Sequence, residues 1–364
     1  MAAPGNKRNL FSPLHLSTLR VLKTISISLR PCASAFSLSV LLVLINISSC
    51  TNENKQSQTE NKQATTQPTI LVPEFNADSA YSFVQTQVDF GPRVPGTDAH
   101  AQCAEYLKNK LMHYGLKTQV QTETVSTYDG KKFRLKNIIG EYNPQATQRI
   151  LIMAHWDTRP WADQDSIRKT EPFDGANDGA SGVAVLLEVA RQLQNAKLPV
   201  GIDIFFSDME DYGQEEEDTK FPRQENTWCL GTQYWARNPH KPGYFAQYGI
   251  LLDMVGGVNP VFPKEGTGMY FASDVVNKVW GIAQGLGYAQ YFTNDLASQT
   301  TDDHLYVNQL ANIKCIDIVH YEVSRRDYPV YHHTHGDNMT IIDKNTLQMV
   351  GRVVLNVIFR EQGL

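Results

Sequence analysis

Apolar positions from about residue 149 onward fall into short continuous runs that alternate with stretches of helical spacing. A short apolar run bounded by polar residues is typical of a buried strand, whereas apolar residues three and four positions apart indicate a helix. The expected strands are 149–154, 201–207, 249–255, 267–272 and 313–319, and the expected helices are 181–195, one from about 231, 274–285 and 344–361. This alternation predicts a mainly parallel sheet covered by helices.

The part of the domain before residue 149 carries two helical patterns followed by two strand-like runs. The first helix follows Asn76, whose side chain can cap it, and the second follows Thr97 and stops at Gly115. Strands are expected at 118–125 and 133–142, joined through a hairpin turn at Asp129 and Gly130. Residues 75–364 are therefore predicted to form a single α/β domain, with a twisted, mixed and mostly parallel central sheet flanked by helices.

The N-terminal 50 residues have the pattern of a bacterial lipoprotein signal. Basic residues precede the apolar stretch 35–47, which ends in Ser48, Ser49 and Cys50. Small residues before a cysteine mark that thiol for lipid attachment. We expect residues 1–50 to be the signal, and a lipid on Cys50 to be the protein's only link to a membrane. An ordinary secretory signal, with Cys50 incidental, is the alternative.

A polar tether is predicted after Cys50. Residues 51–74 are rich in Asn, Gln, Thr, Glu and Lys and carry few large apolar side chains, which is typical of disorder. The expected location is the bacterial cell envelope, at the outer membrane, with the domain facing the periplasm. We expect a monomer.

Composition narrows the function classes. The 364 residues are 41% hydrophobic and 20% charged, with a net charge of −5 and no long basic run, so we expect no nucleic-acid binding. Within the polar excursion 211–227, the hydrophilic insertion 213–220 is expected to be a solvated loop and not an acidic binding site. Within the domain, Cys103, Cys229 and Cys315 are expected to be buried thiols, with one disulfide among them left open.

Polar residues suited to metal chemistry follow the ends of the predicted strands. His155 and Asp157 follow the first, and the pair Glu210 and Asp211 follows the second. Further candidates are Asp178, Asp253, Asp302, Asp303 and the histidines at 332, 333 and 335. In an open α/β sheet, ligands bind at the carboxyl ends of the strands. The sequence therefore predicts a polar site at that edge of the sheet.

The residue types at this edge suit zinc. Zinc takes tetrahedral N and O ligands, and a catalytic zinc keeps one position open for water or substrate. Asp178, one member of the Glu210/Asp211 pair and one histidine of the 332–335 cluster meet that need. In an adjacent acid pair, one carboxylate can bind the metal while the other transfers protons. Here Asp211 would bind the metal and Glu210 would transfer protons.

The order of these motifs resembles the zinc-dependent aminopeptidase superfamily, and more closely its glutaminyl cyclase branch, in a bacterial version of the animal-type enzyme. The resemblance runs from about residue 90 to the last helix. It is carried by FGPRVPGTDAH at 90–100, AHWD at 154–157, LLDMV at 251–255 and DDH at 302–304.

The resemblance implies one zinc ion held by Asp178, Asp211 and His333. It implies that Glu210 transfers protons and that Asp253 and Asp302 form a hydrogen-bond network. Tyr328, Met254 and His332 are expected to line the substrate pocket, and Trp228 is expected to form part of its wall. The implied reaction converts an N-terminal glutamine of a peptide or protein to pyroglutamate, with release of ammonia.

Peptide hydrolysis by a two-zinc aminopeptidase is the rival interpretation. In it Asp178 bridges two metals, His155 and Asp253 hold the second ion, and Glu210 activates water. His155 and Asp157 are possible ligands of a second metal; with one zinc, they become supporting residues around the metal ligands. A lipid-anchored binding protein without catalysis is a third hypothesis, which the full set of acids and His333 disfavours.

Overall fold

The structure is a computed structural model that describes residues 71–361, so the predicted signal and most of the predicted tether lie outside the described residues. Within the described range, none of the helices combines the length and the apolar composition that a bilayer crossing requires. The helices are α1 (Ala77–Asp89), α2 (Asp98–His113), α3 (Ala180–Leu193), α4 (Leu230–Arg237), α5 (Gly266–Gly285), α6 (Asp303–Leu310) and α7 (Lys344–Arg360), with a 3-10 turn at Met339–Ile341.

The main sheet is mixed and mostly parallel, as predicted. Its strands are β1 (Lys117–Ser126), β2 (Lys132–Tyr142), β3 (Arg149–His155), β4 (Gly201–Ser207), β5 (Tyr248–Asp253) and β8 (Cys315–Val319). Their order is β1-β2-β4-β3-β5-β8, in which β1, β2 and β4 pair antiparallel and the remaining pairs are parallel. Strand β3 is therefore central, with β4 on one side and β5 on the other.

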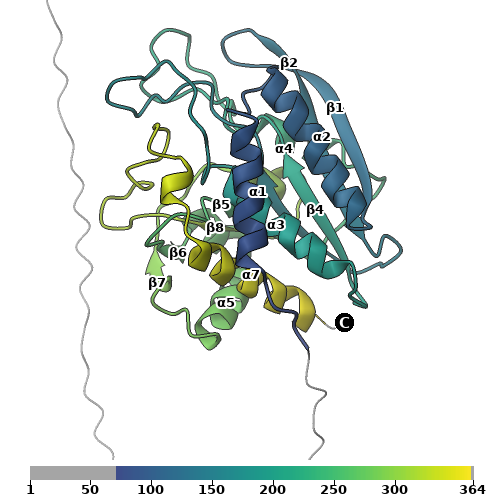
Figure 1. The fold of residues 1–364 in the computed structure, drawn as a ribbon. Helices are drawn as coiled ribbons and strands as arrows, with labels where there is room; N and C mark the ends of the chain where they lie inside the picture. Colours follow the sequence, from purple (N-terminus) through teal and green to yellow (C-terminus); the bar gives the residue numbers. More distant parts are fainter. Residues whose placement is uncertain (1–70, 362–364) are drawn as a thin grey trace, which may run out of the picture. The chain divides into compact units, whose positions relative to one another are not determined.

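Both faces of the sheet are covered, which explains the continuous apolar runs in its strands. On β3, Ile150 and Ile152 belong to the larger core, together with apolar residues of α1, α3 and α7. Leu151 and Met153 point to the opposite face and pack with residues of α4 and α6. In Figure 1, α1, α3 and α7 lie in front of the strands, while α4 lies behind.

Side-chain caps set the helix starts as the sequence predicted. Asn76 accepts a hydrogen bond from the backbone N–H of Ser79, and Thr97 accepts one from His100. Each bond satisfies a helix donor that has no partner within the helix. Gly115, with φ of +82°, follows α2 in the left-handed conformation that ends many helices.

One prediction about the later chain is wrong, and three elements were not predicted. The expected strand at 267–272 is the start of α5, because Glu265 accepts hydrogen bonds from the N–H groups of Thr267 and Gly268 and so caps a helix there. A kink at Ala272 separates these first turns from the expected helix. The short strands β6 (Phe262–Lys264) and β7 (Phe292–Leu296), which pair with each other, were not predicted, and neither was α6.

The cysteines of the domain are buried free thiols. Cys103, Cys229 and Cys315 are each fully buried, and none of them forms a disulfide. The expectation of buried thiols is confirmed, and the disulfide left open by the sequence does not form.

Candidate active site

The strand order creates a switch point at the carboxyl end of β3, where the next strands lie on opposite sides. His155 is the last residue of β3, Asp253 is the last of β5, and the segment with Glu210 and Asp211 follows β4. Crevices at such switch points are the usual binding sites of open α/β sheets. The predicted polar site is therefore assembled at this edge from segments far apart in the sequence.

Asp178, Asp211 and His333 converge on a common point. The Nε2 atom of His333 lies 3.0 Å from Oδ1 of Asp211 and 3.6 Å from Oδ2 of Asp178. Tetrahedral ligands about 2.0 Å from a zinc ion are about 3.3 Å apart, so these two distances bracket the expected value. All three side chains are buried, and together they offer the N and O donors that zinc prefers. The residues present fit the metal.

Further residues hold each member of this donor set in place. Oδ1 of Asp163 lies 3.3 Å from Nδ1 of His333, and Oδ2 of Asp211 accepts a hydrogen bond from the backbone N–H of Arg159 at 2.9 Å. The Asp337 carboxylate accepts from the N–H of Asp178 at 3.0 Å. Such outer partners orient metal ligands. Asp163 and Arg159 were not singled out in the sequence, because they lie in a loop without regular spacing.

His155 and Asp157 occupy different positions relative to the donor set. Nε2 of His155 lies 3.0 Å from Oδ1 of Asp178 and 3.2 Å from Oδ1 of Asp253, and these three side chains are close enough together to hold an ion. The two oxygens of Asp157 instead accept hydrogen bonds from the backbone N–H groups of Glu210 and Asp211, at 3.1 and 3.3 Å. Asp157 thus fixes the acid pair.

A cluster of buried acids surrounds Glu210. Burial and then the negative charge of Asp302 raise the pKa of Glu210 well above its usual value, and the Cys229 thiol donates a hydrogen bond to its Oε1 at 3.2 Å. Burial and the charge of Asp253 likewise raise the pKa of Asp302. Burial and neighbouring charge raise the pKa of catalytic carboxyl groups in the same way in enzymes that use them as general acids and bases.

A cavity of about 350 Å³ opens onto these groups. Trp228, Tyr328 and His332 line it, as predicted, and the His332 ring stacks on the His333 ring with centroids 3.7 Å apart. Met254 is buried and is not among the described residues that line it. Lining residues that the sequence did not single out are Gln164, Glu215, Gln299, Thr300, Thr301, Tyr321, Arg326 and Asp327.

Within the polar excursion 211–227, the expectation of a solvated loop at 213–220 is wrong for its first residues. Residues 211–214 are buried, and Glu215 lines the cavity, where its Oε1 lies 3.5 Å from Nη2 of Arg159. The loop carries the metal-facing Asp211 and then turns outward, so only its later residues are solvated. The hydrophilic composition of the loop does not distinguish its buried first residues from its solvated later residues.

The motif at residues 90–100 acts through Arg93, whose guanidinium is fully buried. It donates hydrogen bonds to the carbonyl oxygens of Trp156, Asp174 and Gly175. One side chain thereby joins the segment after β3 to the loop that carries Asp178. Buried carbonyl groups need such donors, which explains why an arginine occurs in this motif.

A model of peptidase family M28 matches residues 137–358, a range that contains the proposed donor set and all the strands of the parallel part of the sheet. The chain belongs to peptidase family M28. Solved structures similar to this M28 protein include a Bacteroides thetaiotaomicron glutaminyl cyclase bound to N-acetylhistamine, with 50% identity and a TM-score of 0.78. That match covers 80% of this chain and 100% of the other.

Two further relatives of this M28 protein carry different descriptions. A leucine aminopeptidase precursor from Bacteroides thetaiotaomicron VPI-5482 is 50% identical with a TM-score of 0.77, covering 80% of this chain and 99% of that one. The glutaminyl-peptide cyclotransferase of Gloydius blomhoffii is 26% identical, covering 72% of this chain and 75% of that protein. Proteins described as cyclases and as a peptidase thus share this fold.

Proposed function

We propose that this M28 protein is a zinc-dependent glutaminyl-peptide cyclotransferase. The observation that carries the proposal is the 50% identity, over 80% of the chain, to a protein described as a glutaminyl cyclase. The site fits this activity, because the donor set of Asp178, Asp211 and His333 lies next to a buried acid cluster around Glu210. The substrates are peptides or proteins with an N-terminal glutamine.

The reaction is an intramolecular acyl transfer. The α-amine of glutamine attacks its own γ-carbonyl carbon, a C–N bond closes the five-membered ring, and the bond to the amide nitrogen breaks to release ammonia. No external nucleophile is needed, so the protein's task is to orient the glutamine and to move protons.

The residues divide that task. Asp178, Asp211 and His333 would hold zinc, which when bound polarises the γ-carbonyl. A carboxylate oxygen of Glu210 accepts the proton from the attacking amine and returns it to the departing nitrogen. Burial and the negative charge of Asp302 disfavour the ionised form of Glu210, and the raised pKa makes its carboxylate a stronger base for the first step.

A two-zinc aminopeptidase is the second candidate. The cluster of His155, Asp178 and Asp253 favours it, because the two oxygens of Asp178 face different partners, His155 on one side and His333 on the other. A bridging carboxylate has this arrangement. Without a second ion, the same contacts hold Asp178 in place.

The first test is mass spectrometry of a peptide that begins with glutamine, incubated with the purified zinc-loaded protein. The cyclase is expected to lower the peptide mass by one ammonia and to release ammonia in equal amount. A peptidase would release free glutamine and leave a shortened peptide. The second result would reject the cyclase and favour a second ion at His155 and Asp253.

We also propose that the protein is anchored to the bacterial cell envelope through a lipid on Cys50, with the catalytic domain in the periplasm. The support is the basic, apolar and small-residue order that precedes Cys50. Replacement of Cys50 with serine is expected to move the protein from the membrane fraction to the soluble fraction of a cell lysate. Unchanged membrane association of that variant would contradict the anchor.

A further inference from the structure

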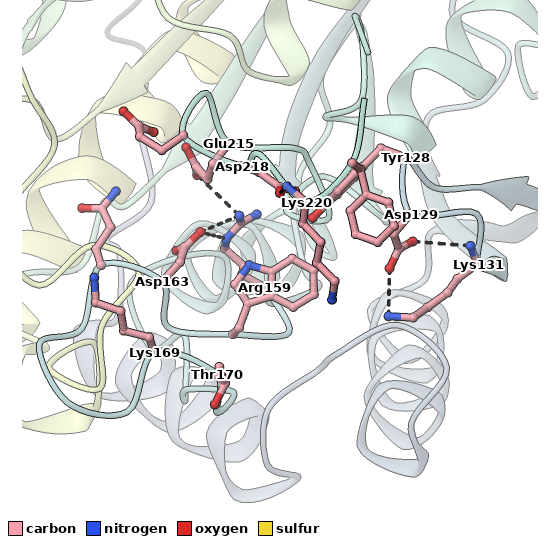
Figure 2. Close-up of a pocket in the computed structure, with 14 residues that line it drawn as sticks. Tyr128, Asp129, Lys131, Arg159, Asp163, Lys169, Thr170, Glu215, Asp218 and Lys220 are labelled. Carbon is pink, nitrogen blue, oxygen red and sulfur yellow. Dashed lines mark hydrogen bonds and ion pairs between the residues drawn. The ribbon is translucent and has the colours of Figure 1, made fainter. Parts of the chain in front are cut away.

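A second cavity, of about 820 Å³, lies next to the active-site cavity. Three segments form its walls: residues 128–131, residues 159–170 and residues 215–221. We call it the downstream cavity. Gln164 and Glu215 line both cavities, so the two share a wall. Figure 2 shows Arg159 at its centre, between Asp163 on one side and Asp129 on the other.

The charges in the downstream cavity are already compensated. Arg159 donates to Asp163 at 2.6 Å, and Lys131 lies 2.9 Å from Asp129. In all, four basic and five acidic residues line the cavity, so their charges nearly cancel. The cavity therefore offers little net attraction for a charged ligand.

Aromatic rings supply the remaining surface of the downstream cavity. Trp161, Tyr128 and Phe221 line it, and the rings of Tyr128 and Phe221 meet edge to face with centroids 5.6 Å apart. Trp161 and Phe221 are only half-buried, so part of each ring is open to a ligand, although Arg159 lies over the Trp161 ring and Lys220 over the Phe221 ring. Large flat apolar surfaces of this kind favour aromatic and large apolar side chains.

A series of planar groups connects the two cavities. The Arg159 guanidinium lies 5.2 Å from the Trp161 ring and 4.8 Å from the Trp228 ring. The Trp228 ring is nearly parallel to the ring of His333, at an interplanar angle of 14° and a centroid distance of 6.3 Å. These rings and the guanidinium therefore form a row of planar groups from His333 to the downstream cavity.

We infer that the downstream cavity binds an aromatic or large apolar side chain from the second or third residue of the substrate, an inference that rests on the proposed function. When the N-terminal glutamine occupies the active-site cavity, the rest of the peptide leaves along the shared wall. Extended residues advance about 3.3–3.6 Å each, so a side chain one or two positions after the glutamine reaches the next cavity. A volume of about 820 Å³ accommodates a large side chain with adjoining backbone.

The test compares kcat/KM for five substrates: glutaminamide, Gln-Ala-Ala-Ala, Gln-Phe-Ala-Ala, Gln-Ala-Phe-Ala and Gln-Glu-Ala-Ala. We expect one of the two phenylalanine peptides to exceed the alanine peptide by about tenfold, because burial of an aromatic side chain stabilises the complex. The glutamate peptide is expected to resemble the alanine peptide. Equal values for all four peptides, or a preference for glutamate, would overturn the inference.

Substitution of Phe221 by alanine tests whether the preference for phenylalanine peptides depends on the downstream cavity. The Phe221→Ala variant is expected to lose most of the phenylalanine preference and to cyclise glutaminamide like the wild type. Phe245→Ala, at a ring 60% exposed and outside the downstream cavity, is the matched control and should keep the preference. Trp161→Leu provides a second variant at the cavity wall.

The outcomes separate this inference from the proposed function. If neither glutaminamide nor any of the peptides is cyclised, the proposed function and the inference about the downstream cavity are both rejected. If all the substrates cyclise and the phenylalanine preference persists in Phe221→Ala and Trp161→Leu, only the downstream cavity is rejected.

Discussion

Replacement of Glu210 with glutamine is expected to lower kcat for glutamine cyclisation by about 100- to 10,000-fold, the usual contribution of a positioned general acid or base. Glutamine has nearly the same shape but cannot accept and return a proton. Zinc binding is expected to persist, because Asp211, whose Oδ1 lies 3.0 Å from Nε2 of His333, is unchanged. Steady-state ammonia release and zinc content by atomic emission measure the two effects.

The matched control is Glu225→Gln, which makes the same change on an exposed part of the same loop, outside both cavities. It is expected to leave kcat unchanged. Loss of zinc from the Glu210→Gln variant would mean that Glu210, and not its neighbour, binds the metal. Full activity of that variant would remove Glu210 from the proton-transfer step.

Strand and helix patterns predicted most of the fold because the parallel strands are buried on both faces. Ile150 to Met153 alternate between the two cores, and each must be apolar, so the run is continuous and easily recognised. The segment after Glu265 has the same apolar character but forms a helix, because the Glu265 carboxylate caps it. Composition alone did not distinguish these two outcomes.

The site was predictable where it follows strand ends and unpredictable where it depends on tertiary contacts. His155, the Glu210 and Asp211 pair, and Asp253 each end or follow a strand, so the parallel topology places them at one edge. Asp163 approaches His333 from a loop, and nothing in the local sequence indicates that distance of 3.3 Å. The buried start of the 211–227 loop was missed for the same reason.

The contacts of Asp157 narrow the choice between its two proposed roles. Both of its oxygens accept hydrogen bonds from the backbone of Glu210 and Asp211, and burial raises its pKa to about 6 even though the nearby His155 ring lowers it. Oδ1 of Asp157 lies 3.8 Å from Nδ1 of His155, whereas Asp178 and Asp253 face Nε2, the other nitrogen of that ring. A second metal, if it binds, therefore depends on His155, Asp178 and Asp253.

Replacement of Asp178 with alanine is expected to weaken zinc binding by more than about 100-fold, because loss of an outer partner alone costs about 10- to 100-fold. Oδ2 of Asp178 lies 3.6 Å from Nε2 of His333 and its Oδ1 lies 3.0 Å from Nε2 of His155, so this carboxylate lies between the two histidines. Cyclase activity is expected to fall to background. Zinc per protein in a zinc buffer of fixed free concentration, together with ammonia release, checks both effects.

The matched control is Asp174→Ala, at an acid of the same loop whose backbone carbonyl, and not its side chain, contacts Arg93. It should retain both zinc and activity. A wild-type content of one zinc is expected, because the cyclase needs one polarising ion, whereas two would favour the aminopeptidase. Wild-type zinc content in the Asp178→Ala variant would contradict its place among the ligands and require the metal to lie elsewhere along this edge of the sheet.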